Sequence, residues 1–208
     1  MREDTQIASS VVNGIRRLLI DEGRWPEVER AALEADPEME GWLEDAGARP
    51  FVSFAGHRVL LDVLGRDRGP AGLRALGRAR FRAAIELGAV APILRCWVRQ
   101  YAHSPGALMR VTPFVWDAVM RGAGRLVLGT SDADHIVYEV ADAPETICSA
   151  PLWHALLEGY GTELLLRTGR DCAVRIEGSA GRLTLRADWA SSSQAPPRRG
   201  GGRGDAGS

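Results

Sequence analysis

The feature that most constrains the fold of this 208-residue chain is a stretch near its end, residues 149–189, in which a helix leads directly into a β-hairpin. Ser149 can cap the first helical turn, Pro151 suits the first helical position, and Gly169 suits a left-handed helix stop. Between these signals the apolar residues recur at helical spacing and form one stripe: Trp153, Leu156, Leu157, Tyr160 and Leu164. We therefore predict a helix with one strongly apolar side.

The residues after Gly169 alternate between apolar and polar side chains, as paired strands do. The segments 172–177 and 183–189 carry the alternation, and the turn Gly178-Ser179-Ala180-Gly181 joins them. One face is apolar, and the other carries Arg175, Glu177, Thr184 and Arg186. We expect the helix to cover the apolar face and the charged face to meet water.

Composition excludes several enzyme classes. All 26 basic residues are arginine. Without lysine the chain cannot form a Schiff base, a cofactor aldimine or the lysine contact of a phosphate loop or kinase. The three cysteines lie far apart without a C-x-x-C pair, so they read as small buried residues and not as a zinc or dithiol site. No Ser-His-Asp order, G-x-S-x-G elbow or H-E-x-x-H motif is present, and we predict a protein that is not an enzyme.

Net charge and hydropathy limit the classes of partner that the chain can have. The formal net charge is −1, and the isoelectric point is about 6.4. A general nucleic-acid binder needs a net basic surface, so no nucleic-acid partner is expected. No apolar run approaches the roughly 20 residues that span a bilayer, and the first residues lack the apolar segment of a secretion signal. We predict no membrane insertion and a cytoplasmic location.

The first half of the chain predicts helices. The first runs from about Gln6 to Ile20, and a second opens at Trp25-Pro26. Residues 46–50 read as a loop, after which Ser53 can cap a helix that ends in the glycine-rich segment 65–69. A longer helix from Pro70 carries four arginines between positions 74 and 82, typical of a solvated face. Pro92 starts or kinks the next helix.

The second half predicts strands. Leu108 to Val119 is rich in strand-forming residues, and its Pro113 indicates an edge position or a bulge. Residues 126–128 and 136–140 suit two further strands. Helices first, then a strand pair, then a helix and a last hairpin define an α+β fold. We predict one domain over residues 1–190 and a disordered Ser/Pro/Gly/Arg-rich tail over 191–208.

The helix after Pro92 has the most informative surface. Ile93, Trp97 and Tyr101 are four residues apart and form an aromatic-rich stripe. A polar line borders it and consists of Cys96, Gln100 and His103. A polar line beside an aromatic stripe is suited to a ligand or a partner.

Four other features each allow a functional and a structural interpretation. His154 and Glu158 could bind metal or act as an acid/base pair, but a surface i, i+4 hydrogen bond explains them more simply. Asp132, Asp134 and His135 could hold a cation, although Asp-rich turns between strands are common. The glycines at 159 and 161 indicate either close packing within the chain or a smooth dimer contact. His57 is typical of a core or boundary histidine.

The order of motifs resembles a known superfamily. Residues 73–81, the hydrophobic helix after them, Ser104-Pro105-Gly106 and a strand pair resemble the superfamily of haem nitric-oxide/oxygen-binding domains, 4-vinyl-reductase domains and transport-particle (TRAPP) subunits. Residues 153–159, 165–169 and the hairpin closing at Trp189 are most similar to a paralogous bacterial family of unknown function within or near it. The similarity covers Val11 to Trp189 as small motifs and element order.

This resemblance implies a helical layer over a twisted antiparallel sheet of about four strands, with a ligand pocket between them in some relatives. Haem-binding members attach iron through a histidine on the helix before a segment that corresponds to residues 104–110 here. Counting back from Pro105 places Cys96 near the ligand position. The Tyr-x-Ser-x-Arg motif that holds haem propionates is missing from residues 128–134. The sequence therefore argues against haem, and no cofactor is predicted.

The sequence and the resemblance together lead to two hypotheses. The first is a non-enzymatic sensor or interaction module of bacterial signalling or regulation, which could hold a small apolar ligand between helices and sheet and which has a protein partner or forms a homodimer. Its predicted ligand-binding residues are Cys96, Trp97, Gln100, Tyr101, His103 and Arg110. The alternative is a haem- or metal-dependent gas sensor, in which Cys96 would be an axial ligand and not a buried core thiol.

Overall fold

The computed structural model describes residues 4–87, 91–179 and 181–190. Its N-terminal half is almost wholly helical and contains two three-residue strands. In chain order the elements are β1 (Gln6–Ala8), α1 (Ser9–Asp21), α2 (Trp25–Ala35), α3 (Met39–Ala48), β2 (Phe51–Ser53) and α4 (Phe54–Leu87). The predicted tail over 191–208 lies outside the described residues.

The C-terminal half alternates short helices with strands and ends in the predicted helix and hairpin. Its elements are α5 (Ala91–Tyr101), α6 (Pro105–Met109), α7 (Thr112–Val119), β3 (Met120–Arg121), β4 (Arg125–Ser131), β5 (His135–Ala141), α8 (Glu145–Cys148), α9 (Pro151–Leu166), β6 (Cys172–Ser179) and β7 (Arg182–Trp189). No helix of the described residues is long and apolar enough to cross a bilayer.

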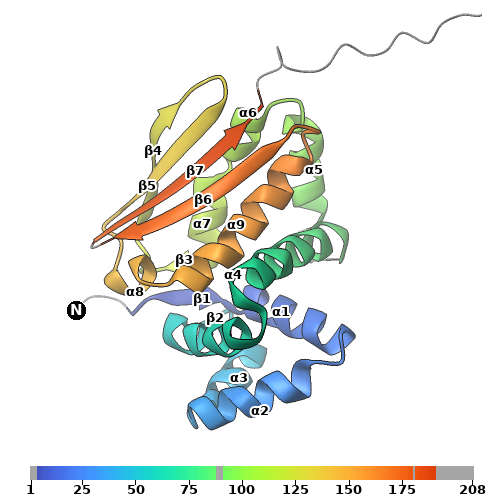
Figure 1. Cartoon of the computed structure of the whole chain (residues 1–208), viewed down its shortest axis with the longest axis vertical. Coiled ribbons are helices and arrows are strands. Elements are labelled where there is room, and N and C mark those ends of the chain that lie inside the picture. Colours follow the sequence, from blue (N-terminus) through green and yellow to red (C-terminus); the bar gives the residue numbers. More distant parts are fainter. Residues whose placement is uncertain (1–3, 88–90, 180, 191–208) are drawn as a thin grey trace, which may run out of the picture.

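A four-stranded antiparallel sheet with the order β4-β5-β7-β6 dominates this half. Its inner face is apolar, because Ile136, Tyr138 and Val140 of β5 alternate with outward residues and are at most 4% exposed. Figure 1 shows α9 running along the sheet, with α4 beyond it and α1 to α3 at the far end of the molecule. The predicted α+β class, the helical layer on a twisted sheet and the late helix before the hairpin are confirmed.

The close packing of α4 against α9 explains the glycines in the late helix. A Cβ at Gly159 would collide with the carbonyl oxygen of Arg74, and one at Gly77 would collide with the carbonyl oxygen of Leu156. A Cβ at Gly161 would lie 3.0 Å from Val174 in β6. Both predicted helical glycines therefore serve contacts within the chain, and the dimer interpretation of them is not needed.

The glycine-rich break in the first half falls where the sequence predicts it. Gly69 has φ 61° and ψ −179°, which interrupts α4 and separates it into two helical parts. Pro70 follows at once and begins the second part, where its missing N–H costs no helical hydrogen bond. Gly169 likewise has φ 70° just after α9, so this predicted left-handed stop is confirmed.

The first predicted helix begins too early. Residues 6–8 are the strand β1, which pairs with β2 on one side and β3 on the other in a small sheet of order β2-β1-β3. Ile7 lies opposite Val52 and Met120, and all three are buried. The partners are about 45 and 113 residues away along the chain, so no local pattern could reveal the pairing.

The strand predicted over 108–119 is wrong, because the chain forms two short helices there. The hydroxyl of Ser104 accepts a hydrogen bond from the Ala107 N–H at 3.3 Å and caps α6. Pro105 and Pro113 each lie in the first turn of their helix, where proline is tolerated. Helix capping and proline placement outweigh the β propensity of the valines in this segment.

The predicted cap at Ser149 is also wrong. The residue before α9 is Ala150, and α9 has no side-chain cap. Ser149 instead follows α8, and its hydroxyl donates a hydrogen bond of 2.8 Å to the carbonyl oxygen of Glu145. Pro151 does occupy the first turn of α9 as predicted.

Candidate functional site

Four of the six predicted ligand residues on and after α5 are exposed, and none of the six lines either of the two cavities described below. Cys96, Gln100 and His103 are exposed, and so is Arg110 after α6. Trp97 and Tyr101 are half-buried, and the side chain of Ile93 lies outside the described part. The interpretation of Cys96 as a buried core thiol is wrong. Ligand binding by these six residues remains a prediction.

Trp97 contacts an aromatic residue that the sequence did not single out. Its ring lies 5.3 Å from the ring of Phe114 in α7, at an interplanar angle of 71°. Two cavities stand out in the described residues: one of about 400 Å³ against α2, lined by Pro26 and Leu33, and one of about 370 Å³ between α4, α9 and β6. Neither lies beneath Trp97, so the helix–sheet pocket expected there has no counterpart among them.

An exposed apolar surface lies beside this pair of rings. Of the six large apolar side chains that are exposed in the described residues, four lie on α7 and β4, which pack against one another. They are Phe114, Val115, Val127 and Leu128. We use the term α7–β4 face for this set, which includes side chains on both sides of the edge strand β4. Phe114 is 65% exposed, which is costly for a residue of this size unless another surface covers it.

Strand β4 adds an open sheet edge to this face. Among the described residues its only neighbour is β5, so its other edge leaves backbone N–H and C=O groups unpaired. Leu128 lies opposite the buried Tyr138, and Val127 lies opposite Glu139 on the other side of the sheet. Both faces of the edge strand therefore carry an exposed apolar side chain, at 47% exposure each. The sequence concealed this because an apolar run of this kind is also typical of a buried strand.

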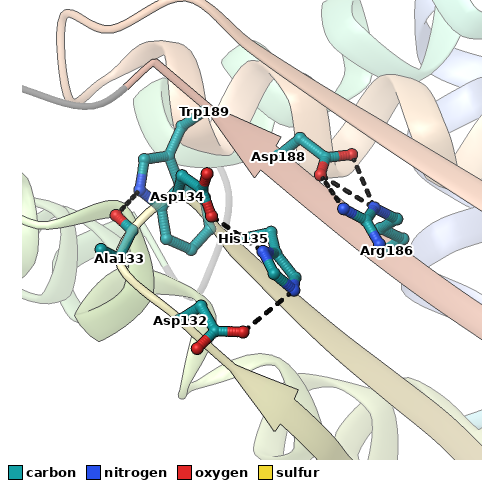
Figure 2. A network of polar contacts seen from close by, with 7 residues as sticks. All are labelled: Asp132, Ala133, Asp134, His135, Arg186, Asp188 and Trp189. Atoms are coloured by element: carbon teal, nitrogen blue, oxygen red, sulfur yellow. Dashed lines mark hydrogen bonds and ion pairs between the residues drawn. The ribbon is translucent and has the colours of Figure 1, made fainter.

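The candidate cation site at the β4–β5 turn is a closed polar network. Figure 2 shows the His135 ring between two carboxylates, with Nδ1 2.8 Å from Asp134 Oδ1 and Nε2 3.2 Å from Asp132 Oδ2. Trp189 Nε1 donates to the Ala133 carbonyl oxygen at 2.9 Å, which attaches the turn to the end of β7. The hydrogen bond from His135 holds the pKa of Asp134 below its ordinary value.

This network has a structural role in the turn. The hydrogen bond between His135 Nδ1 and Asp134 fixes the ring, and Nε2 lies at ion-pair distance from Asp132. No cluster of three or more His, Cys, Asp or Glu residues in the described ranges is arranged to hold a metal ion. The structural interpretation of the Asp-rich turn therefore accounts for its residues.

His154 and Glu158 are both buried, and each forms hydrogen bonds with its own partners and not with the other. His154 Nε2 lies 2.8 Å from the Ile147 carbonyl oxygen, and burial lowers its pKa. Glu158 accepts a hydrogen bond from Arg74 Nε at 2.6 Å and another from the Ile176 N–H at 3.0 Å. The predicted surface hydrogen bond between them is wrong, and the acid/base pair finds no support, because each has its own structural partner.

His57 lies in the core without a hydrogen-bond partner. It is 0% exposed, and neither ring nitrogen has a partner among the described residues. Its ring stands edge-on to Trp153 at 5.3 Å and lies 6.0 Å from Phe54. Burial lowers the pKa of His57 to about 3. The predicted core location is confirmed, and the histidine is neutral at physiological pH.

The arginine run at 74–82 is not a plain solvated face. Arg74 pairs with Glu158, and Arg82 Nε lies 3.0 Å from Glu163 Oε1. Both carboxylates belong to α9 and are almost fully buried. Arg80 instead reaches α1 and donates to the Ser10 carbonyl oxygen at 2.9 Å. The sequence predicts a solvated face for these arginines, because it does not show that α9 packs against this side of α4.

Comparisons with known proteins identify the fold. No family model matches the chain, and no curated protein matches its sequence. Among solved structures it is similar to the Fe(II) unliganded H-NOX protein from K. algicida, with a TM-score of 0.62 and 9% identity over 91% of this chain and 100% of that one. A mutant of that protein, in which one alanine is replaced by glycine, gives a TM-score of 0.60 and 11% identity over 89% and 98%.

A third structure, a Tt H-NOX with one phenylalanine replaced by leucine, is similar with a TM-score of 0.52 and 13% identity over 89% of this chain and 96% of that one. The three matches span nearly the whole of each chain, so the fold is that of the haem nitric-oxide/oxygen-binding class. The resemblance read from the sequence is therefore confirmed as a likeness of fold.

The described residues do not fit a haem. Cys96, the residue nearest the expected ligand position, is exposed on α5. Neither cavity reaches α5, and the contact of Trp97 with Phe114 occupies the stripe beside it. The segment expected to hold the propionates forms the end of β4 and the closed Asp132–His135 network. The fold is thus shared with haem proteins, while the side chains that would hold the group are not arranged for it.

Proposed function

We propose that this chain is a non-enzymatic regulatory module with a sensor-type fold, and that it works by association through the α7–β4 face with a second copy of itself. The observation that carries the proposal is the concentration of exposed apolar side chains on α7 and on the open edge of β4. An interface of this kind buries apolar surface and pairs the free backbone groups of the strand in one step.

A second copy suits this edge because the strand is complementary to itself. Two β4 strands that pair antiparallel across a two-fold axis at the irregularity between Leu128 and Thr130 would bring each Arg125 towards Asp132 of the second copy, which lies just after the strand and also pairs with His135 of its own chain. No carboxylate lies within ion-pair distance of Arg125 in the described part of the chain. The same register brings the two Leu128 side chains together near the axis.

Association accounts for the face better than a ligand does. The small apolar ligand predicted from the sequence would need a cavity beneath Trp97, and neither cavity lies there. The absence of a catalytic motif in the sequence supports a binding role. The predicted homodimer therefore becomes the main element of the proposal, and signalling or regulation is the role that its fold suggests.

Sedimentation equilibrium tests the proposal directly. We expect the wild-type chain to form a dimer and Leu128→Lys to weaken dimerisation at least about 10-fold, because like charges would meet at the two-fold axis. Ile20→Lys is the matched control, since Ile20 is 53% exposed on α1, far from β4 in the fold. Val127→Lys repeats the test from the other side of the sheet if Leu128→Lys does not fold. A monomeric wild type, or equal effects of Leu128→Lys and Ile20→Lys, would contradict the proposal.

The second candidate is a haem-dependent gas sensor, and the likeness to the Fe(II) H-NOX structures favours it. It predicts that the purified chain, mixed with haem, acquires a Soret band that weakens in Cys96→Ala. We expect neither result, because Cys96 lies on the exposed side of α5 and lines neither of the two cavities described above. A stoichiometric Soret band lost in Cys96→Ala would replace our proposal with this one.

A further inference from the structure

A row of three arginines on α4 faces the late helix, and its middle member is left without a carboxylate. Arg74, Arg78 and Arg82 are four residues apart and so lie on one side of α4. Glu158 of α9 pairs with Arg74 at 2.6 Å, and Glu163 pairs with Arg82 at 3.0 Å. Each outer arginine therefore has a partner across the helix contact.

Arg78 has no such partner among the described residues. No carboxylate oxygen there lies within 4.0 Å of its guanidinium, and its Nε is buried without a hydrogen bond. Thr162, one helical turn after Glu158, lies at the corresponding position of α9 and lines the same cavity. A buried guanidinium N–H without an acceptor is costly, so this position favours an acceptor supplied from outside the chain.

The cavity beside Arg78 is large enough for such an acceptor. It measures about 370 Å³, opens between α4, α9 and the edge strand β6, and is polar. This volume is near the lower end of the range of small-molecule sites. The Ile176 N–H on the open edge of β6 is already satisfied by Glu158.

The charges that line the cavity favour an anion. Arg74 and Glu158 neutralise one another. The remaining charged residues that line the cavity are two positive ones, Arg78 and Arg175, and one negative one, Glu177. Arg175 lies opposite Arg186 on β7, whose guanidinium already holds Asp188. The cavity therefore carries two arginines without a carboxylate partner in the described chain, and one acidic group.

We propose that this cavity binds a small organic anion through a carboxylate or phosphate group, with the Arg78 guanidinium as the main donor. The planar guanidinium matches the geometry of both groups and can donate two parallel hydrogen bonds. Arg175 adds a second positive charge, and the Thr162 hydroxyl can donate to a remaining oxygen. The volume restricts the ligand to one anionic head on a body of a few atoms.

Cys172 gives a chemical readout that is separate from stability. It lines the cavity, its Sγ lies 3.7 Å from the Thr162 carbonyl oxygen, and it is half-buried. Burial raises the pKa of Cys172, so its alkylation is slow enough to follow. An anion on Arg78 would cover this thiol. Cys148 is buried and away from the cavity, and Cys96→Ser removes the exposed thiol from the measurement.

The test measures Cys172 alkylation by mass spectrometry, and the melting temperature, in the full Cys96→Ser chain with inorganic phosphate, acetate or chloride at matched ionic strength. We expect phosphate or acetate, but not chloride, to slow alkylation at least about 5-fold and to raise the melting temperature. Whichever of the two protects more identifies the head group. We expect Arg78→Gln to weaken the protective anion about 10-fold or more, because charge-assisted hydrogen bonds are lost.

Arg17→Gln is the matched control, since Arg17 is exposed on α1. It should leave the protection unchanged. Arg78→Gln alone should fold as well as the parent, because the Nε that it removes has no partner. If that variant does not fold, Arg175→Gln serves in its place and should also weaken protection. Chloride acting as strongly as phosphate and acetate, or protection of equal strength in the arginine variants and in Arg17→Gln, would overturn the proposal.

Discussion

The unpartnered core histidine predicts a specific loss of stability in mild acid. His57 is fully buried, and burial lowers its pKa from the ordinary value of 6.5 to about 3. In the unfolded chain the imidazole regains the ordinary pKa, so the unfolded state binds a proton at a higher pH than the native state does. The native state therefore keeps its full stability above about pH 6.5 and loses it as the pH falls towards 3.

The size of this effect follows from the two pKa values. Each pH unit between them costs about 1.4 kcal/mol, so His57 alone should remove about 2 kcal/mol between pH 7 and pH 5 and about 4 kcal/mol by pH 3. The loss up to pH 5 is a substantial fraction of the roughly 5–15 kcal/mol by which proteins of this kind are stable. Other groups also titrate in this range, so the effect has to be isolated by a variant.

The variant His57→Phe isolates the titration. A phenyl ring suits the apolar setting of Phe54 and Trp153 and cannot be protonated. Urea unfolding followed by tryptophan fluorescence at pH 5, 6 and 7 gives the free energy of unfolding of both proteins. We expect the wild type to lose about 2 kcal/mol more than His57→Phe between pH 7 and pH 5.

The control is His103→Gln, in which an exposed histidine after α5 is replaced. It should follow the wild-type pH dependence. Equal pH dependence of the wild type and His57→Phe would refute the reasoning, and so would an NMR titration in which His57 ionises near pH 6.5. Either result would mean that water or another polar group reaches the ring.

Two further predictions concern packing and capping. Gly159→Ala should lower the free energy of unfolding by about 1–3 kcal/mol, because the new Cβ would collide with the Arg74 carbonyl oxygen. Gly41→Ala in α3, where the space is open, should instead raise the free energy of unfolding by up to about 1 kcal/mol. Urea unfolding of the two variants checks this, and equal effects would contradict the α4–α9 contact. Ser104→Ala should lower the free energy of unfolding by about 1 kcal/mol, because α6 loses its N-terminal cap. Ser149→Ala should lower it by less, because Ser149 caps no helix N-terminus. If thermal unfolding gave the reverse order, the caps would be misassigned.

The fold could be predicted from the sequence where local signals agree. The helix α9 and the hairpin β6–β7 follow from helical spacing, Pro151, Gly169 and strict alternation, all within about 40 residues. The strand β1 could not be predicted, because three residues give no periodicity and both partners are distant in sequence. The segment at Pro113 contains residues typical of a strand, and the place of Pro113 in the first turn of α7 and the packing of α7 against β4 decide for a helix.

The candidate sites were less accessible to sequence reasoning. Exposed Phe114 and buried Trp116 lie two residues apart, and the sequence does not show which of them the fold covers. The pairing of Arg74 and Arg82, and the isolation of Arg78 between them, depend on how α9 is placed beside α4. The absence of a propionate-binding motif after the second strand could be established from the sequence, because such a motif is a short contiguous run of residues.

Native mass spectrometry of the purified full chain tests the central claim of self-association without haem. We expect the dominant species to have twice the chain mass of 22.5 kDa, with no added mass of a haem, and to lose its dimer signal in Leu128→Lys but not in Ile20→Lys. A dominant monomer, or a species that carries one haem per chain, would contradict the account.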